Sequence, residues 1–337
     1  MRIYRNIPER ADRPVALTIG NFDGVHLGHQ AMLARLVQAA RTRGLPACVM
    51  TFEPHPREFF APDQAPTRIT SLREKLELLA GCGVDRVYVC RFDYAFAQIT
   101  AEAFIDDILR RGLDTCYLLV GDDFRFGARR AGDFAMLQTV LGNRSAQRGV
   151  GVAAASPLPN PSPQGGGTCM VEAMESIEVN GVRVSSTAIR EALVAGNLDG
   201  ARMLLGRPYS ISGRVVGGDK LGKQIGFPTA NVQMKHNRPP LSGIFVVEVH
   251  GLGEVPLPGA ASLGVRPTVH EKGKAVLEVH LLDFDRRIYG KHLRVDFLKK
   301  LRDEEKYPDL PTLTAQIMRD VENTRNYFVN RKERQGR

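Results

Sequence analysis

The sequence predicts an α/β, Rossmann-like domain followed by a small antiparallel β-barrel domain with a C-terminal helix. The chain has 337 residues, more than the roughly 100–200 residues of a single domain. Its first half alternates strand-like and helix-like segments, an order that favours a parallel sheet covered by helices. From Tyr209 onward, short strand-like segments are separated by turn signals, which is typical of a compact barrel. We therefore expect two domains, at 1–200 and 205–330.

The first domain is expected to begin with a short apolar strand and an amphipathic helix. The strand covers 15–20, and the helix covers 27–43 and ends at Gly44. The expected elements that follow are a strand at 47–52, a helix at 71–80, a strand at 84–90, a helix at 100–111 and a strand at 116–120. Strands that are separated by helices in this way pair in parallel.

A segment rich in proline and glycine at 153–169 interrupts this alternation. Because its composition suits neither helix nor strand, we predict local disorder. The segment could be a linker between domains, but we prefer an insertion within the first domain, because a motif at 184–190 that belongs to this domain follows it. Beyond it we expect a helix at 186–195, strands at 209–216, 243–249, 275–282 and 293–297, and a C-terminal helix at 310–328.

The overall charge suits anionic small molecules. The formal net charge is +9 at pH 7, and such an excess attracts nucleotides, other phosphorylated molecules or nucleic acid. The basic residues are spread along the chain apart from a short tail at 331–334, without a basic stripe and interleaved aromatic residues. We therefore expect small-molecule partners and no nucleic acid; no feature of the sequence predicts an oligomeric state.

The cysteines and the apolar segments indicate a cytoplasmic protein. The five cysteines are odd in number and lack C-x-x-C spacing, so they predict neither a disulfide framework nor a zinc site and indicate a reducing compartment. The N-terminus lacks the apolar core of a signal peptide. No apolar stretch approaches the roughly 20 residues that cross a bilayer, so we expect no membrane partner.

A candidate phosphate site follows the first predicted strand. Free backbone N–H groups and a helix dipole favour an anion at this strand-to-helix turn. His26 and His29 lie three residues apart on one face of the first helical turn and can donate hydrogen bonds to phosphate oxygens. They could instead bind a metal, but no third ligand of fitting spacing lies nearby, so we favour the phosphate site. The other candidate residues of this turn are Gly20, Phe22, Asp23 and Gly28.

A second phosphate-binding candidate lies at the start of the helix expected at 186–195. Ser185, Ser186 and Thr187 offer three hydroxyl groups, and Arg190 follows them. Side-chain and backbone donors in this arrangement can hold a polyphosphate. The alternative is a plain helix N-cap formed by Ser186 or Thr187, and the stretch taken alone favours that alternative.

Four motifs in one order resemble those of a known family. H-x-G-H after the first strand and S-S-T-x-I-R near the domain end resemble motifs of the nucleotidyltransferase superfamily. Between them, T-F-E-P-H-P at 51–56 and V-G-D-D-F-R-F-G at 120–127 narrow the match. Residues 1–200 resemble the FMN adenylyltransferase module of the prokaryotic bifunctional riboflavin kinase/FAD synthetases, from whose pattern the segment at 153–169 departs as an extra loop.

This resemblance implies roles for individual residues. His26 and His29 would contact the ATP phosphates, Asp123 and Arg190 would lie near the nucleotide, and the hydroxyl groups at 185–187 would help to hold the phosphates. Glu53, Pro54, His55 and Pro56 would lie by the flavin-phosphate pocket, with a structural role in that turn as the alternative for His55. The chemistry would be in-line attack of the FMN phosphate on the α-phosphorus of ATP, with Mg²⁺ on the departing pyrophosphate.

The second domain has its own candidate phosphate and metal site, in a glycine-rich stretch at 217–231. Its glycines and lysine, including Gly222 and Lys223, can cradle phosphates, although the stretch is not a Walker A sequence. Thr229 and Asn231 lie on the same side of an extended chain and offer oxygen ligands of the kind that suit Mg²⁺. An ordinary glycine-rich turn is the alternative for this stretch alone.

Further motifs make residues 205–330 resemble the riboflavin kinase module. They are L-G-V-R-P-T at 263–268, L-E-V-H-L-L-D-F at 277–284, I-Y-G-K at 288–291 and L-R-D-E at 301–304. The resemblance implies that Glu278 is the general base for the riboflavin 5′-hydroxyl. It also implies that Thr229 and Asn231 hold Mg²⁺ and that Arg302 helps to order the flavin or nucleotide loop. For Glu278 alone, an exposed surface glutamate would be the alternative.

Two details differ from the pattern of this module. Ser262 stands where Asn is frequent, and the pair Arg286-Arg287 replaces an expected acidic residue. Neither change removes a residue that the resemblance assigns to the chemistry, so they bear on substrate affinity.

The predicted function is a bifunctional enzyme of flavin cofactor synthesis. Its C-terminal domain would phosphorylate riboflavin with ATP to FMN, and its N-terminal domain would adenylylate FMN with ATP to FAD and pyrophosphate. One alternative is an enzyme in which one domain has lost its activity. Another is a flavin- or nucleic-acid-binding regulator, for which Glu278, His26 and His29 would have no obvious use.

Overall fold

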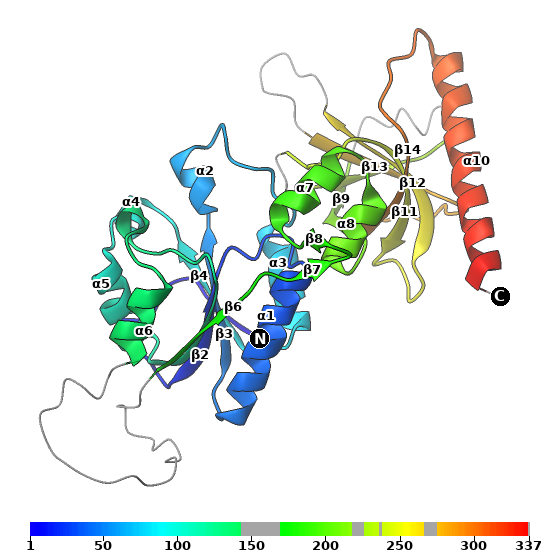
Figure 1. Cartoon of the computed structure of the whole chain (residues 1–337). Helices are drawn as coiled ribbons and strands as arrows, with labels where there is room; N and C mark the ends of the chain where they lie inside the picture. Colours follow the sequence, from blue (N-terminus) through cyan, green and yellow to red (C-terminus); the bar gives the residue numbers. More distant parts are fainter. Residues whose placement is uncertain (143–168, 218–225, 236–237, 266–274, 336–337) are drawn as a thin grey trace, which may run out of the picture. The chain divides into compact units, whose positions relative to one another are not determined.

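The computed structural model describes residues 1–142, 169–217, 226–235, 238–265 and 275–335 (Figure 1). The chain divides into two compact units. The first comprises Met1–Pro66 and Lys75–Arg183, and the second comprises Thr67–Glu74 and Val184–Arg337. The predicted insertion lies outside the described residues at 153–168, as do the predicted phosphate-binding residues Gly222 and Lys223.

A six-stranded parallel sheet forms the centre of the first unit. Its strand order is β1-β4-β3-β2-β5-β6, and every neighbouring pair is parallel. The strands are β1 (Arg2–Tyr4), β2 (Val15–Ile19), β3 (Ala47–Glu53), β4 (Arg86–Arg91), β5 (Thr115–Gly121) and β6 (Met170–Met174). The Rossmann-like sheet is thus confirmed, while β1 and β6 at its two edges were not predicted.

The helices of this unit follow the predicted alternation with one change of type. The helix predicted at 27–43 is α1 (Leu27–Thr42), and Gly44 follows it with a φ of +65°. The helix predicted at 100–111 is a short α5 (Ala101–Ala103) that continues as a π-helix, η1 (Phe104–Gly112). The remaining helices are α2 (Pro56–Phe60), α3 (Leu72–Gly81), α4 (Tyr94–Ala97), the 3₁₀ turn η2 (Ala128–Arg130) and α6 (Phe134–Gly142).

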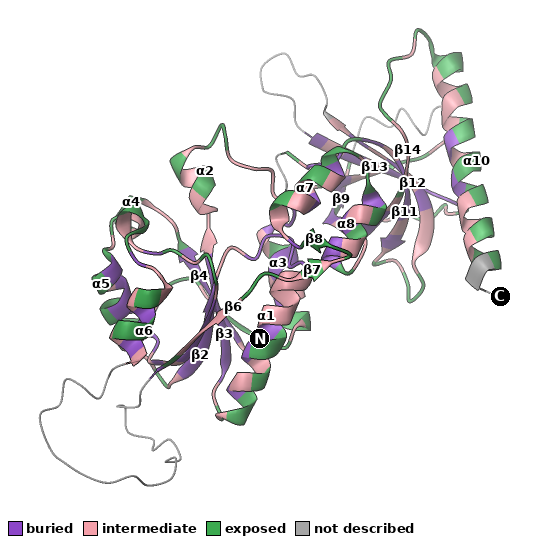
Figure 2. Ribbon diagram, in the orientation of Figure 1, coloured by how far each residue is buried: buried purple, intermediate pink, exposed green. Residues whose placement is uncertain are grey.

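The two faces of the sheet carry separate parts of the core, and Figure 2 shows that strands β2 and β3 at its centre are mostly buried. Val15, Leu17 and Ile19 of β2 point to one face, where they pack with residues of η1 and α6. Ala16 between them points to the other face and packs with Leu36 of α1 and its neighbours. Because successive strand residues alternate between faces, burial of every β2 residue requires cover on both sides.

A closed six-stranded barrel is the main element of the second unit. Every neighbouring pair is antiparallel, and the pairing of β9 with β10 closes the ring. The strands are β9 (Tyr209–Val216), β10 (Ala230–Gln233), β11 (Gly243–His250), β12 (Leu257–Val265), β13 (Ala275–Leu281) and β14 (His292–Arg302). The predicted barrel is confirmed, as is its C-terminal helix, α10 (Leu310–Gln335).

Shorter elements precede the barrel in the chain. β7 (Glu178–Val179) and β8 (Val182–Arg183) form a hairpin within the first unit. α7 (Ser186–Val194) and α8 (Leu198–Leu205) belong to the second unit and pack against each other. No helix among the described residues combines the length and the apolar character that a bilayer span requires.

Candidate active sites

The first predicted site lies at the carboxyl edge of the parallel sheet. β2 pairs with β3 on one side and with β5 on the other, so the strand order reverses between β2 and β5. At such a switch point the loops after the two strands diverge and leave room for a ligand. The loop after β2 carries the two histidines, and the loop after β5 carries Asp123. Motifs that are far apart in the sequence therefore meet at one edge of the sheet.

The turn between β2 and α1 has an unusual backbone. Phe22 and Val25 have φ values of 49° and 39°, and Gly24 between them has a φ of 83°. The left-handed region is unfavourable for a β-branched residue such as Val25, so the surrounding packing must hold it there. Phe22 and Val25 are both almost fully buried. The packed turn thereby fixes the point at which α1 begins and the direction of its histidines.

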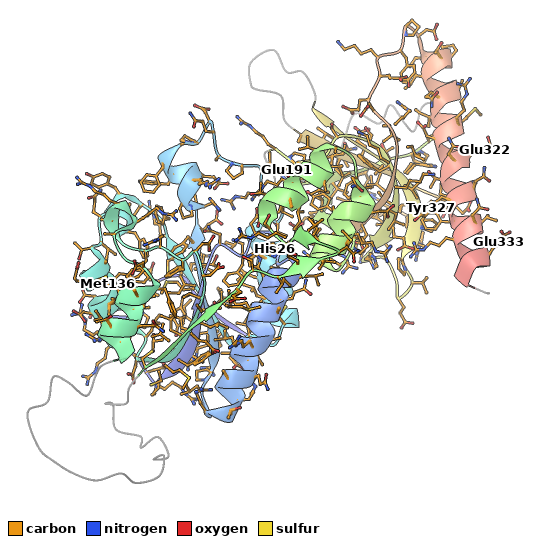
Figure 3. The ribbon with its side chains drawn as sticks, viewed as in Figure 1. His26, Met136, Glu191, Glu322, Tyr327 and Glu333 are labelled. Carbon is orange, nitrogen blue, oxygen red and sulfur yellow. The ribbon has the colours of Figure 1, made fainter. Side chains whose placement is uncertain are left out.

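His26 is the N-cap of α1 and lies at the start of this helix (Figure 3). Its Nδ1 atom accepts a hydrogen bond of 3.3 Å from the backbone N–H of His29. Because Nδ1 accepts, the neutral ring carries its proton on Nε2, which makes Nε2 a donor. A Cβ atom on Gly28 would lie 3.2 Å from the same ring, so glycine leaves this cap undisturbed.

The two imidazole rings stack, with centroids 3.6 Å apart and planes inclined by 15°. Burial, reinforced by the nearby His26 and Lys75, holds the pKa of His29 well below its usual value, so the ring is neutral at pH 7. Its Nδ1 atom is buried and has no hydrogen-bond partner among the described residues, and the same holds for Oδ1 of Asn21. Because unpaired buried polar atoms are costly, the packing around this turn must compensate for both.

The metal alternative for the two histidines gains no support. The part of the chain that the structure describes contains no group of three or more His, Cys, Asp or Glu residues placed to hold a metal ion. His26 and His29 therefore lack a third protein ligand of these types within it.

A cavity of about 550 Å³ opens beside this turn. Gly20, Asn21 and Asp123 line its polar side, so it borders the histidine turn and the loop after β5. Its apolar side consists of the phenylalanines Phe52, Phe60, Phe92, Phe96, Phe104, Phe124 and Phe126. Several of these rings meet edge to face, for example Phe52 and Phe92 at 5.8 Å between centroids. Such a lining suits a planar aromatic ligand.

Sequence reasoning missed most of this aromatic lining. The phenylalanines come from a strand and from several loops and helices, and only Phe52, Phe124 and Phe126 stood inside a motif. The recurrence of phenylalanine at 92, 96 and 104 was the sequence signal that could have indicated this aromatic lining.

The predicted flavin-phosphate residues after β3 have mixed placements. Pro56 lines the cavity, whereas Glu53 ends β3. His55 is the N-cap of α2: its Nδ1 accepts from the backbone N–H of Arg57 at 3.1 Å, and its own backbone N–H donates to Glu58. The structural role that was the alternative for His55 is therefore observed.

The residues of the S-S-T-x-I-R motif lie at the start of α7, in the second unit, whereas His26 and His29 belong to the first. Ser185 is the N-cap, where its Oγ accepts from the backbone N–H of Ala188 at 3.1 Å. Ser186 and Thr187 are the first helical residues, so the plain N-cap falls one residue before the expected position. Arg190 donates from Nε to the carbonyl oxygen of Thr67 at 2.6 Å.

The barrel brings the predicted kinase residues together. Thr229 precedes β10, and Asn231 within β10 is paired with Glu278 of β13. Directly paired residues project to the same face of an antiparallel sheet, and Thr229 lies two residues before Asn231 on the extended chain. Glu278 is half-buried and, with Thr229, lines a cavity of about 260 Å³, so it is not an exposed surface glutamate.

A second, smaller cavity of about 140 Å³ shares Thr229 with the first. Its walls include the two arginines that depart from the expected pattern. The guanidinium of Arg286 lies 5.0 Å from the ring centroid of Phe284, and that of Arg287 lies 5.5 Å from the ring centroid of Tyr289. These cation–π contacts orient both arginines at the cavity wall.

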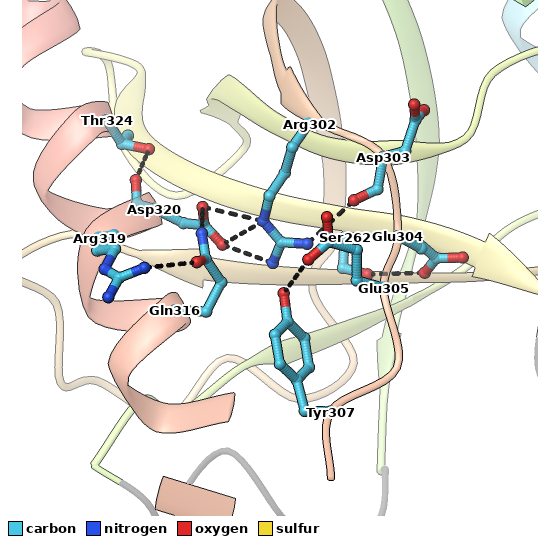
Figure 4. Close-up of polar contacts among 10 residues, drawn as sticks. All are labelled: Ser262, Arg302, Asp303, Glu304, Glu305, Tyr307, Gln316, Arg319, Asp320 and Thr324. Carbon is cyan, nitrogen blue, oxygen red and sulfur yellow. Dashed lines mark hydrogen bonds and ion pairs between the residues drawn. The ribbon is translucent and has the colours of Figure 1, made fainter. Parts of the chain in front are cut away.

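Arg302 and Ser262 also line the larger cavity, but their polar atoms already have protein partners. Arg302 pairs with Asp320 of α10, and Ser262 donates its hydroxyl to Glu304 at 3.3 Å (Figure 4). The predicted flavin-binding residue Arg302 is therefore part of the cavity wall with its guanidinium turned to Asp320. Sequence reasoning missed the apolar residues of α10 that complete this wall, Leu313, Ile317 and Val321.

Comparisons with known proteins identify both halves of the chain. The sequence model of the FAD synthetase family matches residues 9–158, and that of riboflavin kinase matches residues 205–328. The bifunctional riboflavin kinase/FMN adenylyltransferase of Escherichia coli K12 is 47% identical over 97% of this chain and 98% of its own length. The protein of that description from Pseudomonas fluorescens is 46% identical over 92% of this chain and 91% of its own.

A solved structure has the same fold. It is described as a macrolide-efflux protein from Streptococcus pneumoniae, with a TM-score of 0.76 and 28% identity over 96% of this chain and 98% of that one. The two family matches fall on the α/β unit and the barrel in the expected order, and the relatives match over nearly their whole length. The chain belongs to the family of bifunctional riboflavin kinase/FMN adenylyltransferases.

Proposed function

We propose that this chain phosphorylates riboflavin with ATP to FMN and then adenylylates FMN with a second ATP to FAD and pyrophosphate. The observation that carries the proposal is the pairing of a cavity with reactive polar groups in each unit. In the first unit Gly20 and Asn21 line the phenylalanine-rich cavity, at the start of the turn that leads to the stacked histidines. In the second, Glu278 faces a cavity that shares Thr229 with a neighbouring one. We assign adenylylation to residues 1–200 and phosphorylation to residues 205–330.

In the adenylylation step the isoalloxazine ring of FMN occupies the phenylalanine-lined cavity. An oxygen of the FMN phosphate attacks the α-phosphorus of ATP; the bond from that phosphorus to the bridging oxygen breaks, and pyrophosphate leaves. His26 and His29 donate hydrogen bonds to phosphate oxygens as negative charge develops there. The unusual turn that positions the two histidines and the stacking of their rings support this assignment.

Further residues of this step are assigned through the family resemblance. Around the turn, Gly20, Phe22, Asp23 and Gly28 shape the nucleotide site, and Asp123 borders the same cavity. The residues of α7 assigned to the ATP phosphates are Ser185, Ser186, Thr187 and Arg190. The residues after β3 assigned to the flavin phosphate side are Glu53, Pro54, His55 and Pro56, of which Pro56 lines the cavity.

In the phosphorylation step riboflavin occupies the cavity of about 260 Å³ and the nucleotide the smaller one. Glu278 accepts the proton of the riboflavin 5′-hydroxyl, whose oxygen attacks the γ-phosphorus of ATP, and ADP leaves. Thr229 separates the two cavities, so a γ-phosphate beside it lies next to Glu278. Arg286 and Arg287 add positive charge on the nucleotide side. Gly222 and Lys223 keep their assignment to the ATP phosphates from the sequence alone.

Mg²⁺ fits this donor set. The hydroxyl of Thr229 and the amide oxygen of Asn231 are the hard oxygen ligands that Mg²⁺ prefers when it shares a site with phosphates. When bound, the ion neutralises negative charge on the phosphate oxygens.

We expect these reactions to take place in the cytoplasm, where cysteines stay reduced. Burial raises the pKa of the Cys48 and Cys90 thiols to about 12, so both remain protonated.

The test is to incubate the purified protein with riboflavin, ATP and Mg²⁺ and to follow FMN and FAD by chromatography. The wild type should form FMN and then FAD. Glu278→Ala should form no FMN but should convert added FMN to FAD, whereas His29→Ala should accumulate FMN, each with a loss of at least about 100-fold in its own step. If the wild type forms neither product, and leaves added FMN unchanged, the enzyme assignment fails.

A further inference from the structure

The C-terminal helix α10 forms one wall of the larger barrel cavity. Leu313, Ile317 and Val321 recur every four residues, so they lie on one face of the helix, and all three line the cavity. Across the cavity lie strand residues that include Ile244 and Glu278. The size of the cavity therefore depends on where α10 rests against the barrel. Apolar contact is non-directional and does not by itself fix that position.

A buried ion pair joins this wall to the barrel (Figure 4). Arg302, the last residue of β14, donates from Nη2 to Oδ2 of Asp320 at 2.8 Å and from Nε to both carboxylate oxygens at 3.2 Å. The two side chains are 18% and 6% exposed. Asp320 lies on α10 between Ile317 and Val321 and, like them, lines the cavity. A planar guanidinium bound in this way sets both the distance and the orientation of its partner.

Asp320 is further supported from within its own helix. Nε2 of Gln316 donates to Oδ1 of Asp320 at 3.1 Å. The hydroxyl of Thr324, which is fully buried, donates to the carbonyl oxygen of Asp320 at 2.7 Å. The carboxylate thus receives hydrogen bonds from two side chains and is held in one orientation.

Arg302 also organises the loop that leads from β14 to α10. Its Nη1 donates to the carbonyl oxygen of Asp303 at 3.0 Å, and its guanidinium lies 5.7 Å from the ring centroid of Tyr307. Glu304 in the same loop accepts from Ser262, and its carboxylate occupies the space where Gly264 has no side chain. The helix and the loop before it are therefore both positioned by one arginine.

We propose that Asp320 is a positioning residue for riboflavin phosphorylation, which holds α10 in place as a wall of the flavin cavity through Arg302. The inference rests on the proposed assignment of riboflavin to this cavity. Asp320 acts on the substrate indirectly, because its carboxylate is bound by Arg302 and Gln316. Loss of the ion pair leaves Arg302 charged and unpaired at the cavity wall and releases the helix.

The same helix supplies a matched control. Arg325 of α10 pairs with Asp283 through two hydrogen bonds of 2.7 and 2.8 Å. This pair is exposed, at 49% and 73%, and neither residue lines either barrel cavity. Exposed pairs of this kind contribute little to stability. Arg325→Gln therefore removes an ion pair between the barrel and α10 while leaving the cavity wall unchanged.

The experiment compares Asp320→Asn, Gln316→Ala and Arg325→Gln in the full chain. Riboflavin phosphorylation is measured with separate KM values for riboflavin and ATP, and conversion of added FMN to FAD serves as a check on protein concentration. Asp320→Asn should raise the KM for riboflavin by between about 10- and 100-fold, because the wall is displaced, while the KM for ATP stays unchanged. Gln316→Ala should raise the KM for riboflavin by a few-fold, and Arg325→Gln should leave the KM for riboflavin unchanged.

Three results would overturn the inference. An unchanged KM for riboflavin in Asp320→Asn, with a lower maximal rate alone, would mean that the pair only stabilises the fold. An equal rise in the KM for riboflavin in Arg325→Gln would mean that the loss of any contact between α10 and the barrel weakens riboflavin binding. In both cases Glu278→Ala would still abolish FMN formation, so the proposed function would stand. A rise in the KM for ATP alone would instead place the nucleotide in this cavity and overturn the substrate assignment as well.

Should Asp320→Asn not fold, as circular dichroism would reveal, Gln316→Ala decides the question. It keeps both charges of the ion pair and removes the hydrogen bond from Gln316 to Asp320, together with an exposed hydrogen bond of 3.4 Å that Gln316 accepts from Arg319. A raised KM for riboflavin in that variant supports the positioning role, and an unchanged one overturns it.

Discussion

His29 illustrates how burial decides what a titratable side chain can contribute. Stacked on His26 and partly buried, its ring has a depressed pKa and stays neutral at pH 7. A neutral imidazole stabilises developing charge as a hydrogen-bond donor and not as a cation. The contribution of the turn therefore depends more on its geometry than on its charge. Packing around Phe22 and Val25 holds the costly backbone conformation that sets this geometry.

Phe60 offers a test of the aromatic cavity at the residue scale. Its ring is 67% exposed yet lines the cavity, so truncation should remove a substrate contact at little cost to the fold. Phe60→Ala should raise the KM for FMN in adenylylation by about three- to tenfold, which corresponds to roughly 0.5–1.5 kcal/mol of ring contact. Steady-state kinetics with added FMN measures this change.

Tyr94 provides the control for that change. It is 72% exposed, is also aromatic, and does not line the cavity. Tyr94→Ala should leave the KM for FMN unaltered. An equal effect of the two substitutions would argue against the flavin assignment of the cavity.

Single residues also show where sequence reasoning stops. The histidine turn was predictable, because all its groups lie within one short run after a strand. The ion-pair partner of Arg302 was not predictable, because Asp320 lies 18 residues further along the chain, in α10. The motif alone predicted that Arg302 helps to order the flavin or nucleotide loop, and it gave no sign that its donors are directed at Asp320 and the carbonyl oxygen of Asp303.

At the scale of elements, hydrophobic periodicity located α1, β9 and α10 but could not identify elements that depend on their neighbours. β12 contains a proline, two glycines and several small residues, so its local preference for a strand is weak. Pairing with β11 and β13 nevertheless makes this segment a strand. A second example is η1, for which a helix was predicted but the π form was not. Its buried residues, at 104, 105, 108, 109 and 112, have the spacing of an ordinary α-helix, so the apolar pattern gave no sign of the wider π turn.

The end of η1 gives a stability prediction at this scale. A Cβ atom on Gly112 would lie 2.6 Å from Cγ2 of Ile7 and 2.9 Å from the carbonyl oxygen of Pro8. Because the second neighbour is backbone, Gly112→Ala should destabilise the first unit by about 1–3 kcal/mol. Chemical denaturation measures this difference.

Gly81, the last residue of α3, is the matched control. An added Cβ atom there would meet nothing within 4 Å. Gly81→Ala should leave stability unchanged or raise it by up to about 1 kcal/mol. If Gly112→Ala behaved in the same way, η1 would not be packed as the structure describes.

At the scale of the whole molecule, each unit has a cavity of its own. The cavity of the first unit lies at the carboxyl ends of parallel strands, and the larger cavity of the second lies against the wall of a barrel. Sequence patterns predicted both architectures because the two halves differ in the period of their apolar residues. The cavities themselves were not predictable, because their apolar walls are assembled from residues that are distant in the sequence.

This division predicts that the two steps can be supplied by different molecules. A mixture of Glu278→Ala and His29→Ala, each inactive in one step, should form FAD from riboflavin, since FMN released by the second variant can bind to the first. FAD should appear after a lag that shortens as the protein concentration rises, as chromatography of timed samples would show. Absence of FAD, although each variant performs its own half reaction, would mean that FMN is not released between the steps.

The contrast between a closed and an open sheet has a consequence for aggregation. Every barrel strand pairs on both sides, so the described barrel exposes no strand edge to another chain. The parallel sheet ends in β1, which has only three residues, and in β6, where Glu172 forms an ion pair with Arg35. Pairing of a second chain along β6 would crowd and partly dehydrate this ion pair. A strand from a second chain could therefore pair with an edge of the parallel sheet but not with the barrel. The longer of the two edge strands, β6, carries the charged residue Glu172.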